Sequence, residues 1–342
     1  MLRSDYKFST NTVGCLFDTP FSEIENFVRK EKVIIITDEN VYAAHKEKFD
    51  SFPVIVIPAG EENKIQTTCD DVIRQLVELE ADRQSCLIGV GGGVVTDLVG
   101  YIAAIYKRGT MLVLVPTSIL AMVDASVGGK NGIDVGVYKN MVGTTKQPDY
   151  ILFDYDFLDT LPVKEWINGF AEIIKHACIR DLVLFQTLER YTLHEIQSDK
   201  SLIAWLIEKN VAIKMDIVTT DEFELGPRKL LNFGHTVGHA IENLHQLPHG
   251  HAVSIGIVAA CNLSEKLNGL HFSDAQRVVK LLAHYHLPVD IETDYQKVFA
   301  VLKMDKKRED GDMHFIMLNK IGEAQVKKIP LQYLQENLKS IL

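Results

Sequence analysis

The stretch Cys86-Leu-Ile-Gly-Val-Gly-Gly-Gly-Val-Val-Thr-Asp97 places a short apolar run directly before three consecutive glycines. An apolar run of this length predicts a buried strand, and the residues that follow the glycines predict a helix. Glycines at such a turn let backbone N–H groups approach a phosphate, which the N-terminus of the helix attracts. The dinucleotide fingerprint Gly-x-Gly-x-x-Gly is absent, and the glycines alone suit a tight turn equally well, but their position after a strand favours a ligand.

Apolar runs and helical stretches alternate from Lys32 to about Phe153. Buried parallel strands are predicted at residues 33–37, 54–57, 86–90 and 111–115, and helices at residues 41–49, 67–80 and 96–106. This alternation predicts a doubly wound, Rossmann-like α/β domain at residues 1–160, whose ligands bind at the carboxyl ends of the strands. A mainly helical second domain is predicted at residues 161–342, with helices at 164–180, 201–219, 229–245, 252–268 and 273–285.

The composition limits the class of protein and its partners. A chain of 342 residues favours two domains, and a net charge of −10 argues against nucleic acid or an anionic membrane as a partner. The five cysteines contain no Cys-x2-Cys pair and are expected to stay reduced. No apolar run that would make a signal peptide follows Met1, and the longest apolar stretch, Ala252 to Cys261, is too short to span a bilayer. We therefore expect a cytoplasmic protein.

A second informative stretch, Leu231-Asn-Phe-Gly-His-Thr-Val-Gly-His-Ala-Ile-Glu242, carries two histidines one helical turn apart. His235 and His239 would share a helix face, and neutral imidazole is the commonest protein ligand for zinc. A catalytic zinc site usually takes three protein ligands, often two histidines and a carboxylate, and Glu172 is the best candidate for the third. A chance cluster of surface histidines around a turn is the alternative interpretation.

Glycine-rich loops and isolated cations are further candidate site elements. The segment from Asp124 to Asn140 is expected to be an irregular functional loop, with a mobile, solvated loop as the alternative. Residues 58–64 follow another predicted strand and are weak candidates for contacts with a ribose and a phosphate. An anionic substrate is suggested by cations beside glycine and histidine in an acidic chain, namely Arg108, Lys175, Lys214, Arg228 and the pair Lys306-Lys307. For each one singly, a solvated surface charge is the simpler interpretation.

Seven motifs together resemble the 3-dehydroquinate synthase family, in order along the chain from Asp38 to Gly322. They are Gly91-Gly-Gly-Val-Val-Thr-Asp-Leu98, Lys107-Arg-Gly109, Val115-Pro-Thr-Ser-Ile-Leu-Ala121, Val123-Asp-Ala-Ser-Val-Gly-Gly-Lys130, Lys139-Asn140, Ala171-Glu-Ile-Ile-Lys175 and the histidine stretch Leu231–Glu242. The resemblance implies a dehydroquinate synthase-like fold, a homodimer, bound NAD and one divalent metal, zinc or cobalt.

The reaction that the resemblance implies is a lyase step of the shikimate pathway, which leads to the aromatic amino acids. It converts 3-deoxy-D-arabino-heptulosonate 7-phosphate to 3-dehydroquinate and phosphate through transient oxidation by NAD, phosphate elimination, re-reduction and intramolecular aldol closure. The metal is expected to lower the pKa of the hydroxyl that is oxidised. The alternatives are another sugar phosphate cyclase, a metal-dependent alcohol dehydrogenase and a non-catalytic sugar-phosphate-binding protein.

The resemblance also implies roles for individual residues. It makes Glu172, His235 and His249 the metal ligands. His249 thus takes the ligand position that helical spacing alone would give to His239. The resemblance makes Arg108 the arginine that reaches the substrate of the other subunit. NAD contacts are implied for Asp38, Asn40, Gly60, Glu61, Lys64, Gly92, Gly93, Asp97, Thr117, Ser118, Lys130, Lys139 and Thr160. Substrate contacts are implied for Asp124, Lys130, Lys139, Asn140, Lys175, Lys214, Arg228, Asn232, His239 and one of Lys306 and Lys307.

Three positions depart from the family pattern. His251 stands where the family usually has a glutamate, which leaves open whether His249 or His251 is the metal ligand. Ser118 replaces a usual threonine and keeps the hydroxyl. Asn131 replaces a common threonine beside Lys130. None of these changes removes a group that the implied mechanism needs.

Overall fold

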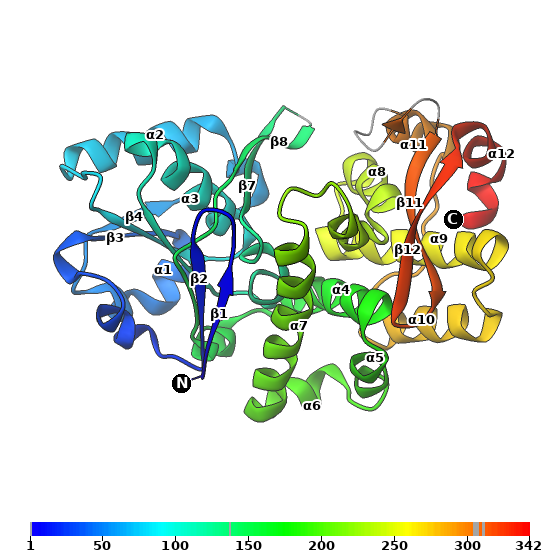
Figure 1. The fold of residues 1–342 in the computed structure, drawn as a ribbon, viewed down its shortest axis with the longest axis horizontal. Coiled ribbons are helices and arrows are strands. Elements are labelled where there is room, and N and C mark those ends of the chain that lie inside the picture. The colour runs from blue at the N-terminus through cyan, green and yellow to red at the C-terminus, as the bar shows by residue number, and fades with distance from the viewer. Residues whose placement is uncertain (1, 137, 304–307, 310–311) are drawn as a thin grey trace. The chain divides into compact units, whose positions relative to one another are not determined.

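The computed structural model describes residues 2–136, 138–303, 308–309 and 312–342 (Figure 1). The chain divides into two compact units. Unit 1 comprises Met1–Trp166 and Ala204–Phe223, and unit 2 comprises Ile167–Ile203 and Glu224–Leu342. The division at residue 160 that the sequence suggests stays a prediction. Lys306 and Lys307, which were expected to supply one substrate contact, lie outside the described residues.

A seven-stranded sheet in the order β1-β2-β9-β6-β5-β3-β4 forms the centre of unit 1. Every neighbouring pair is parallel except β1 with β2. The strands are β1 (Leu2–Lys7), β2 (Thr12–Phe17), β3 (Val33–Asp38), β4 (Val54–Ile57), β5 (Cys86–Gly91), β6 (Met111–Pro116) and β9 (Tyr150–Phe153). The four predicted parallel strands are confirmed. β1, β2 and β9 were not predicted. β1 is polar and largely exposed and lacks an apolar run, whereas β2 and β9 are mostly buried and their apolar runs were not recognised as strands.

Helices cover this sheet and bury both of its faces. Ile34 and Ile36 of β3 belong to one apolar cluster, which α2 (Gln66–Glu78) and α3 (Gly93–Ile105) complete. The alternate residues Val33 and Ile35 belong to a second cluster on the other face. Val41 of α1 (Glu39–His45) packs against that second cluster. Burial of both faces explains why these strands read as unbroken apolar runs, and each buried Ile or Val contributes about 1.5–3 kcal/mol.

The expectation of an irregular loop at residues 124–140 was wrong for most of the segment, which forms regular structure on both sides of a turn at residues 126–129. A single π-helical turn at Ala121–Ala125 leads into an antiparallel hairpin of β7 (Lys130–Val135) and β8 (Tyr138–Thr145). Gly128 and Gly129 have φ values of 99° and 70°, which other residues rarely adopt, and they make the connection between the turn and the hairpin. Glycines, lysines and asparagines weaken the strand signal in the sequence, whereas the hairpin is held by its packing on α3.

Unit 2 is built mainly from helices, as predicted. They are the greater part of α4 (Val163–Arg180), then α5 (Leu182–Leu188), α6 (Leu193–Ser198), the start of α7 (Lys200–Thr220), α8 (His235–His245), α9 (His249–Asn268), α10 (Phe272–His284), α11 (Tyr295–Leu302) and α12 (Leu331–Ile341). The helix predicted at 229–245 is broken, because Gly234 with φ 80° separates a 3₁₀ turn at Pro227–Asn232 from α8.

A small antiparallel sheet in unit 2 was not predicted. Its order is β10-β11-β12, with β10 (Arg308–Glu309), β11 (Asp312–Lys320) and β12 (Glu323–Pro330). Its apolar side chains join those of α8, α9, α11 and α12 in one cluster. In α9, Gly256 allows the backbone of Gly234 to approach closely, since a Cβ on Gly256 would lie 1.8 Å from the Gly234 carbonyl oxygen. This contact fixes the start of α8, where His235 lies.

We predict that Gly256→Ala lowers the free energy of unfolding by about 1–3 kcal/mol, because the added methyl group meets backbone atoms that cannot move away cheaply. Urea unfolding followed by circular dichroism measures the change. Glu265→Ala, at an exposed position of the same helix, is the control and should stay within about 0.5 kcal/mol of the parent. Equal stability of the two variants would contradict the proposed close packing of α8 on α9.

Candidate functional site

The strand order of unit 1 creates a binding edge. β3 has β4 on one side and β5 on the other, so the chain reverses its direction of travel across the sheet between β3 and β5. Ligands of doubly wound sheets bind at the carboxyl ends of the strands at such a reversal. Residues predicted to contact NAD follow four neighbouring strands at this edge: Asp38 ends β3, Gly60–Lys64 follow β4, Gly92 and Gly93 follow β5, and Thr117 and Ser118 follow β6.

The glycine turn after β5 leaves the N-terminus of α3 open. Gly92 is the residue before the helix, and no side chain caps the first N–H groups. A Cβ on Gly91 would lie 2.4 Å from Val95, so a larger residue there would displace the helix. The unsatisfied N–H groups and the positive end of the helix dipole suit a phosphate.

Lys64 is a buried cation at the same edge, with 4% of its surface exposed. Its Nζ pairs with Asp97 and donates a hydrogen bond of 2.7 Å to Oδ1 of Asn140. Burial alone would lower the pKa of Lys64, but Asp97 and neighbouring carboxylates outweigh burial, so its pKa is raised and the ammonium stays charged. These three predicted site residues, from the β4 loop, α3 and β8, therefore form one network.

The other predicted residues of unit 1 divide into anchored and exposed side chains. Lys214 is anchored, because its Nζ lies 2.9 Å from Oδ1 of Asp124 and donates to the Asp124 carbonyl at 2.6 Å. Thr160 shares a 2.7 Å hydrogen bond with Nε2 of His45. Asp38 caps α1 by accepting from the N–H groups of Asn40 and Val41, each at 2.9 Å. Exposed side chains are those of Asn40, Glu61, Arg108, Lys130 and Lys139.

Unit 2 brings three of the predicted metal ligands together. Ligand atoms of Glu172 on α4, His235 on α8 and His249 on α9 all lie within 4.8 Å of one another. Oε1 of Glu172 is 3.5 Å from Nε2 of His235 and 3.3 Å from Nε2 of His249. A second group within the same limit contains His239, Glu242 and His249. His251, the other candidate ligand from the sequence, belongs to neither group among the described residues.

Both imidazoles are oriented by contacts at Nδ1. Nδ1 of His235 lies 3.1 Å from the carbonyl oxygen of Phe233, and Nδ1 of His249 lies 3.4 Å from Oε2 of Glu242. Because a carbonyl and an ionised carboxylate can only accept, each Nδ1 carries the proton. Nε2 of each ring is therefore the nitrogen directed at Glu172, which is the arrangement found when histidine binds a metal.

These residues fit a divalent cation. The carboxylate of Glu172 is fully buried, and the Nε2 atoms of two imidazoles face its Oε1, so a positive charge at this place is favourable. The pKa of His249 reflects the same preference for positive charge. Burial lowers the pKa of His249, but hydrogen bonds with Glu172 and Glu242 outweigh burial and raise the pKa to about 10. Two nitrogens and one carboxylate oxygen are a ligand set typical of zinc.

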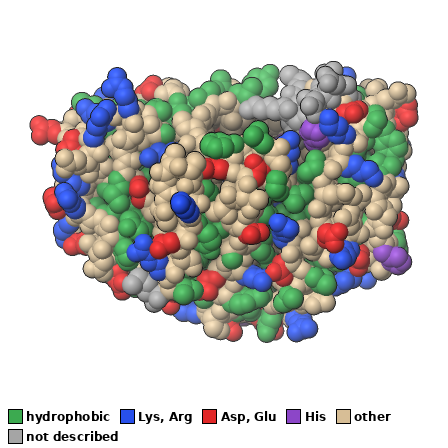
Figure 2. Space-filling model, viewed as in Figure 1, with side chains coloured by type: hydrophobic (Ala, Val, Ile, Leu, Met, Phe, Trp, Pro, Cys, Tyr) green, Lys and Arg blue, Asp and Glu red, His purple; other side chains and the backbone are tan. Residues whose placement is uncertain are grey.

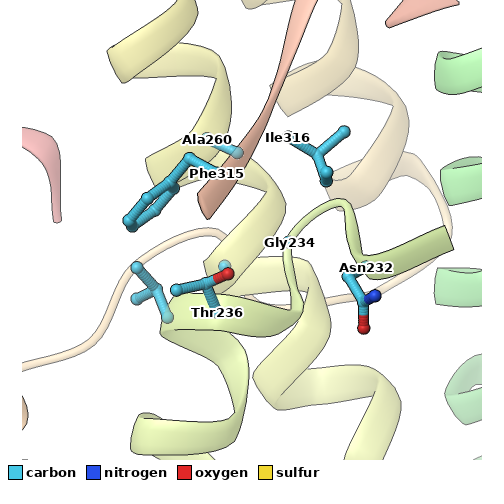
Figure 3. Close-up of a pocket in the computed structure, with 8 residues that line it drawn as sticks. Asn232, Gly234, Thr236, Ala260, Phe315 and Ile316 are labelled. Carbon is cyan, nitrogen blue, oxygen red and sulfur yellow. The ribbon is translucent and has the colours of Figure 1, made fainter. Parts of the chain in front are cut away.

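The remaining predicted residues of unit 2 surround this cluster in part. The Lys175 Nζ pairs with Oε2 of Glu172 inside the protein core. The His239 ring lies 5.2 Å from that of His235. Arg228 is buried, and Nδ2 of Asn232 donates a 2.5 Å hydrogen bond to Oε1 of Glu224. Asn232 also lines a small hollow beside Gly234 and Thr236, which contains no residue of the metal cluster (Figure 3).

Sequence analysis missed three residues of this region. Glu242 contacts His249, Glu224 contacts Asn232, and Oδ1 of Asn168 accepts a 2.6 Å hydrogen bond from the N–H of Gly250, which ties the start of α9 to α4. Glu242 lies one turn after His239 on α8, and this spacing is the signal that could have indicated it. Asn168 and Gly250 are 82 residues apart, and Glu224 and Asn232 are eight apart across a turn, so no helical or strand spacing marks either contact.

Asn131, which departs from the family pattern, has a structural role. Its Nδ2 donates to the carbonyl oxygens of Gly129 and Lys146, at 2.8 and 3.0 Å. A Cβ on Gly100 of α3 would lie 1.8 Å from Oδ1 of Asn131, so the hairpin packs tightly on α3 there.

On the face drawn in Figure 2, lysine and arginine side chains lie among acidic ones. None of the helices in the described part of the chain has the length and apolar character needed to cross a membrane.

Comparison with known proteins identifies the family. Residues 54–168 match the family model described as 3-dehydroquinate synthase N-terminal, and residues 169–308 match that described as 3-dehydroquinate synthase C-terminal. The chain belongs to the 3-dehydroquinate synthase family. A 3-dehydroquinate synthase of Campylobacter curvus is 39% identical over 321 residues, which are 91% of this chain and 92% of that protein. One of Pyrococcus abyssi is 36% identical over 334 residues, 94% of this chain and 98% of that protein.

A solved structure extends this likeness to the fold of both units. The 2-epi-5-epi-valiolone synthase of Streptomyces hygroscopicus, solved with NAD⁺ and Zn²⁺ bound, has a TM-score of 0.89 and 26% identity, and the match covers 99% of this chain and 98% of that one. The predicted family and fold class are confirmed. The individual ligand, NAD and substrate assignments within the family stay predictions.

We predict that Asp97→Ala lowers the free energy of unfolding by about 3–5 kcal/mol, because it leaves the ammonium of Lys64 buried without its partner. Chemical denaturation at neutral pH measures the loss. The matched control is the double variant Lys64→Met with Asp97→Leu, which replaces both charges by apolar groups and should recover most of the stability. A single variant as stable as the parent would show that the ion pair does not hold Lys64 in place.

Proposed function

We propose that the chain is a 3-dehydroquinate synthase, which converts 3-deoxy-D-arabino-heptulosonate 7-phosphate to 3-dehydroquinate and phosphate. Identities of 36–39% to proteins of that name over more than nine-tenths of the chain carry the proposal. The convergence of Glu172, His235 and His249 supports it, since these residues come from three helices and the cluster fits a metal. The alternatives, a different sugar phosphate cyclase, an alcohol dehydrogenase or a non-catalytic binding protein, are not favoured.

Separate sets of residues would bind the two cofactors. In unit 1, the open N-terminus of α3 and the Lys64 network would hold the phosphates and riboses of NAD. In unit 2, Glu172, His235 and His249 would hold zinc or cobalt. When bound, NAD supplies a reversible hydride acceptor and the metal a Lewis acid for the substrate's hydroxyl groups.

The chain's own side chains would bind and orient the substrate. Buried cations such as Lys175 and Arg228 bind carboxylate and phosphate strongly, because little water competes with them. His239 and Asn232 offer further hydrogen bonds to hydroxyl groups. Lys214 is held by Asp124 and so presents its charge from one position. Holding the substrate in one reactive conformer is worth several kcal/mol, roughly up to the 7–11 kcal/mol that effective molarities allow.

The proton that leaves with phosphate elimination does not require a dedicated base. An oxygen of the substrate's own phosphate group can take that proton from the neighbouring carbon. The side chains of the site then need only hold the phosphate group in place, and none of them has to accept this proton.

Two finer points complete the proposal. We infer that the enzyme is a cytoplasmic homodimer and that Arg108 reaches the phosphate of the substrate in the partner subunit. Arg108 is exposed and belongs to a strained turn, in which Lys107 and Arg108 have φ values of 50° and 65°.

We predict that purified protein with the heptulosonate phosphate and a trace of NAD⁺ releases phosphate over many turnovers without net NADH. The reason is that the hydride is returned within each cycle. Phosphate release and absorbance at the NADH band are measured together, and a chelator should abolish the release until zinc or cobalt is restored. Sedoheptulose 7-phosphate and glucose 6-phosphate serve as control substrates. NADH formed in proportion to phosphate, or preference for a control substrate, would refute the proposed reaction.

We predict that Arg108→Ala lowers kcat/KM by about 10- to 100-fold, as expected for the loss of charged hydrogen bonds. Mixed dimers locate the arginine. When Arg108→Ala and Lys214→Met subunits are co-expressed, about a quarter of the parent activity should return, because half of the dimers are mixed and each has one complete site. Mixed dimers as inactive as the two variants alone would place Arg108 in the site of its own subunit.

A further inference from the structure

Glu242 is a buried carboxylate that no proposed catalytic step uses. It lies on α8 with 4% of its surface exposed, and its Oε2 is 3.4 Å from Nδ1 of His249 on α9. A buried charge of this kind costs several kcal/mol unless it is compensated. His249 therefore supplies at least part of the compensation, and the two residues constrain each other.

The close packing of α8 on α9 brings the two side chains together. Gly238 lies one helical turn before Glu242, and a Cβ on Gly238 would be 3.0 Å from the carbonyl oxygen of Ala252. The absence of a side chain at Gly238 lets the two helices approach along the face that carries Glu242. The first turn of α9 is fixed separately by the hydrogen bond from Gly250 to Asn168. His249 thus meets Glu242 in a framework that leaves little freedom to either.

The contact decides which ring nitrogen faces the metal site. An ionised carboxylate accepts hydrogen bonds and cannot donate them, so Glu242 selects the form of His249 that is protonated at Nδ1. Nε2, on the opposite side of the ring, then points toward Glu172 at 3.3 Å. His235 has the same orientation, but there a backbone carbonyl performs the task. The chain therefore uses one carboxylate and one carbonyl to align two imidazoles.

We propose that Glu242 is a positioning residue for the metal centre, which acts by holding the ring of His249 with Nε2 directed at the ion. The inference rests on the ligand set proposed above. Carboxylate partners of ligand histidines also make the ring a stronger donor, and their loss typically costs about 10- to 100-fold in metal affinity. Glu242 would thereby raise the affinity of the site without touching the ion.

The test measures zinc affinity by competition with a chromogenic chelator, on the full chain. Glu242→Ala should raise the Kd for zinc by about 10- to 100-fold, and Glu242→Gln by less, because the amide oxygen can still accept from Nδ1. With cobalt bound, the visible absorption bands should shift in both variants, since they report the geometry of the ligands. Glu195→Ala is the control: it removes the capping contacts of α6, also in unit 2, and should leave the Kd unchanged.

The possible outcomes separate the inference from the proposal on which it rests. His249→Ala should lose zinc almost completely, and retention of zinc by this variant would refute the ligand set. If His249→Ala loses zinc while both Glu242 variants bind it like the parent, only the role of Glu242 is refuted. If Glu242→Gln binds zinc as poorly as His249→Ala, Glu242 is a direct ligand, and the positioning role is also refuted. Circular dichroism establishes that each variant is folded, and Glu242→Gln, which keeps the side-chain volume, covers the case in which the alanine variant unfolds.

Discussion

The buried carboxylate of Glu172 is the constraint on which the architecture of unit 2 depends. Its surface is fully inaccessible, so its charge must be balanced by groups that converge on it from several helices. Lys175 approaches from the same helix, one turn away, and His235 and His249 approach from α8 and α9. The glycines of α8 and α9 that allow close backbone contact are needed for this convergence. Close packing of these helices and charge compensation of Glu172 therefore depend on the same contacts, and these contacts form a site suited to a cation.

Unit 1 depends on a different constraint, the burial of a parallel sheet on both faces. Because helices cover both faces, the edge formed by the carboxyl ends of the strands is where polar side chains gather. Lys64 and Asp97 neutralise each other there, and Asn140 accepts a hydrogen bond from Lys64. The same edge holds the uncapped start of α3. A nucleotide bound at this edge would meet dipoles and charges that are already oriented, so little reorganisation is required.

The sequence predicted some elements well and others badly, and the reasons are local. The strand Val33–Asp38 could be predicted from its own residues, because it begins with a run of four apolar β-branched residues. The hairpin of β7 and β8 carries no such signal: glycine, lysine and asparagine dominate it, and contacts with α3 hold it in place. The sheet of β10, β11 and β12 was missed because an apolar run such as that of β11 does not separate strand from helix. The helix expected over 229–245 fails at Gly234, whose left-handed conformation no periodicity reveals.

What the sequence determined by itself is the strand–helix alternation of unit 1, the helical character of unit 2, the family and the types of side chain available for binding. Spacing along a helix indicated His235 and His239 as a pair, because residues three or four apart lie on the same face of a helix. The resemblance to the family named Glu172 and His249 beside His235, but only the tertiary structure shows that these residues, of which Glu172 lies 63 residues before His235, converge in space. It also decided that Glu242 aligns His249. A metal site is defined by distances in space, and those distances follow from how α4, α8 and α9 pack, which no short stretch of sequence encodes.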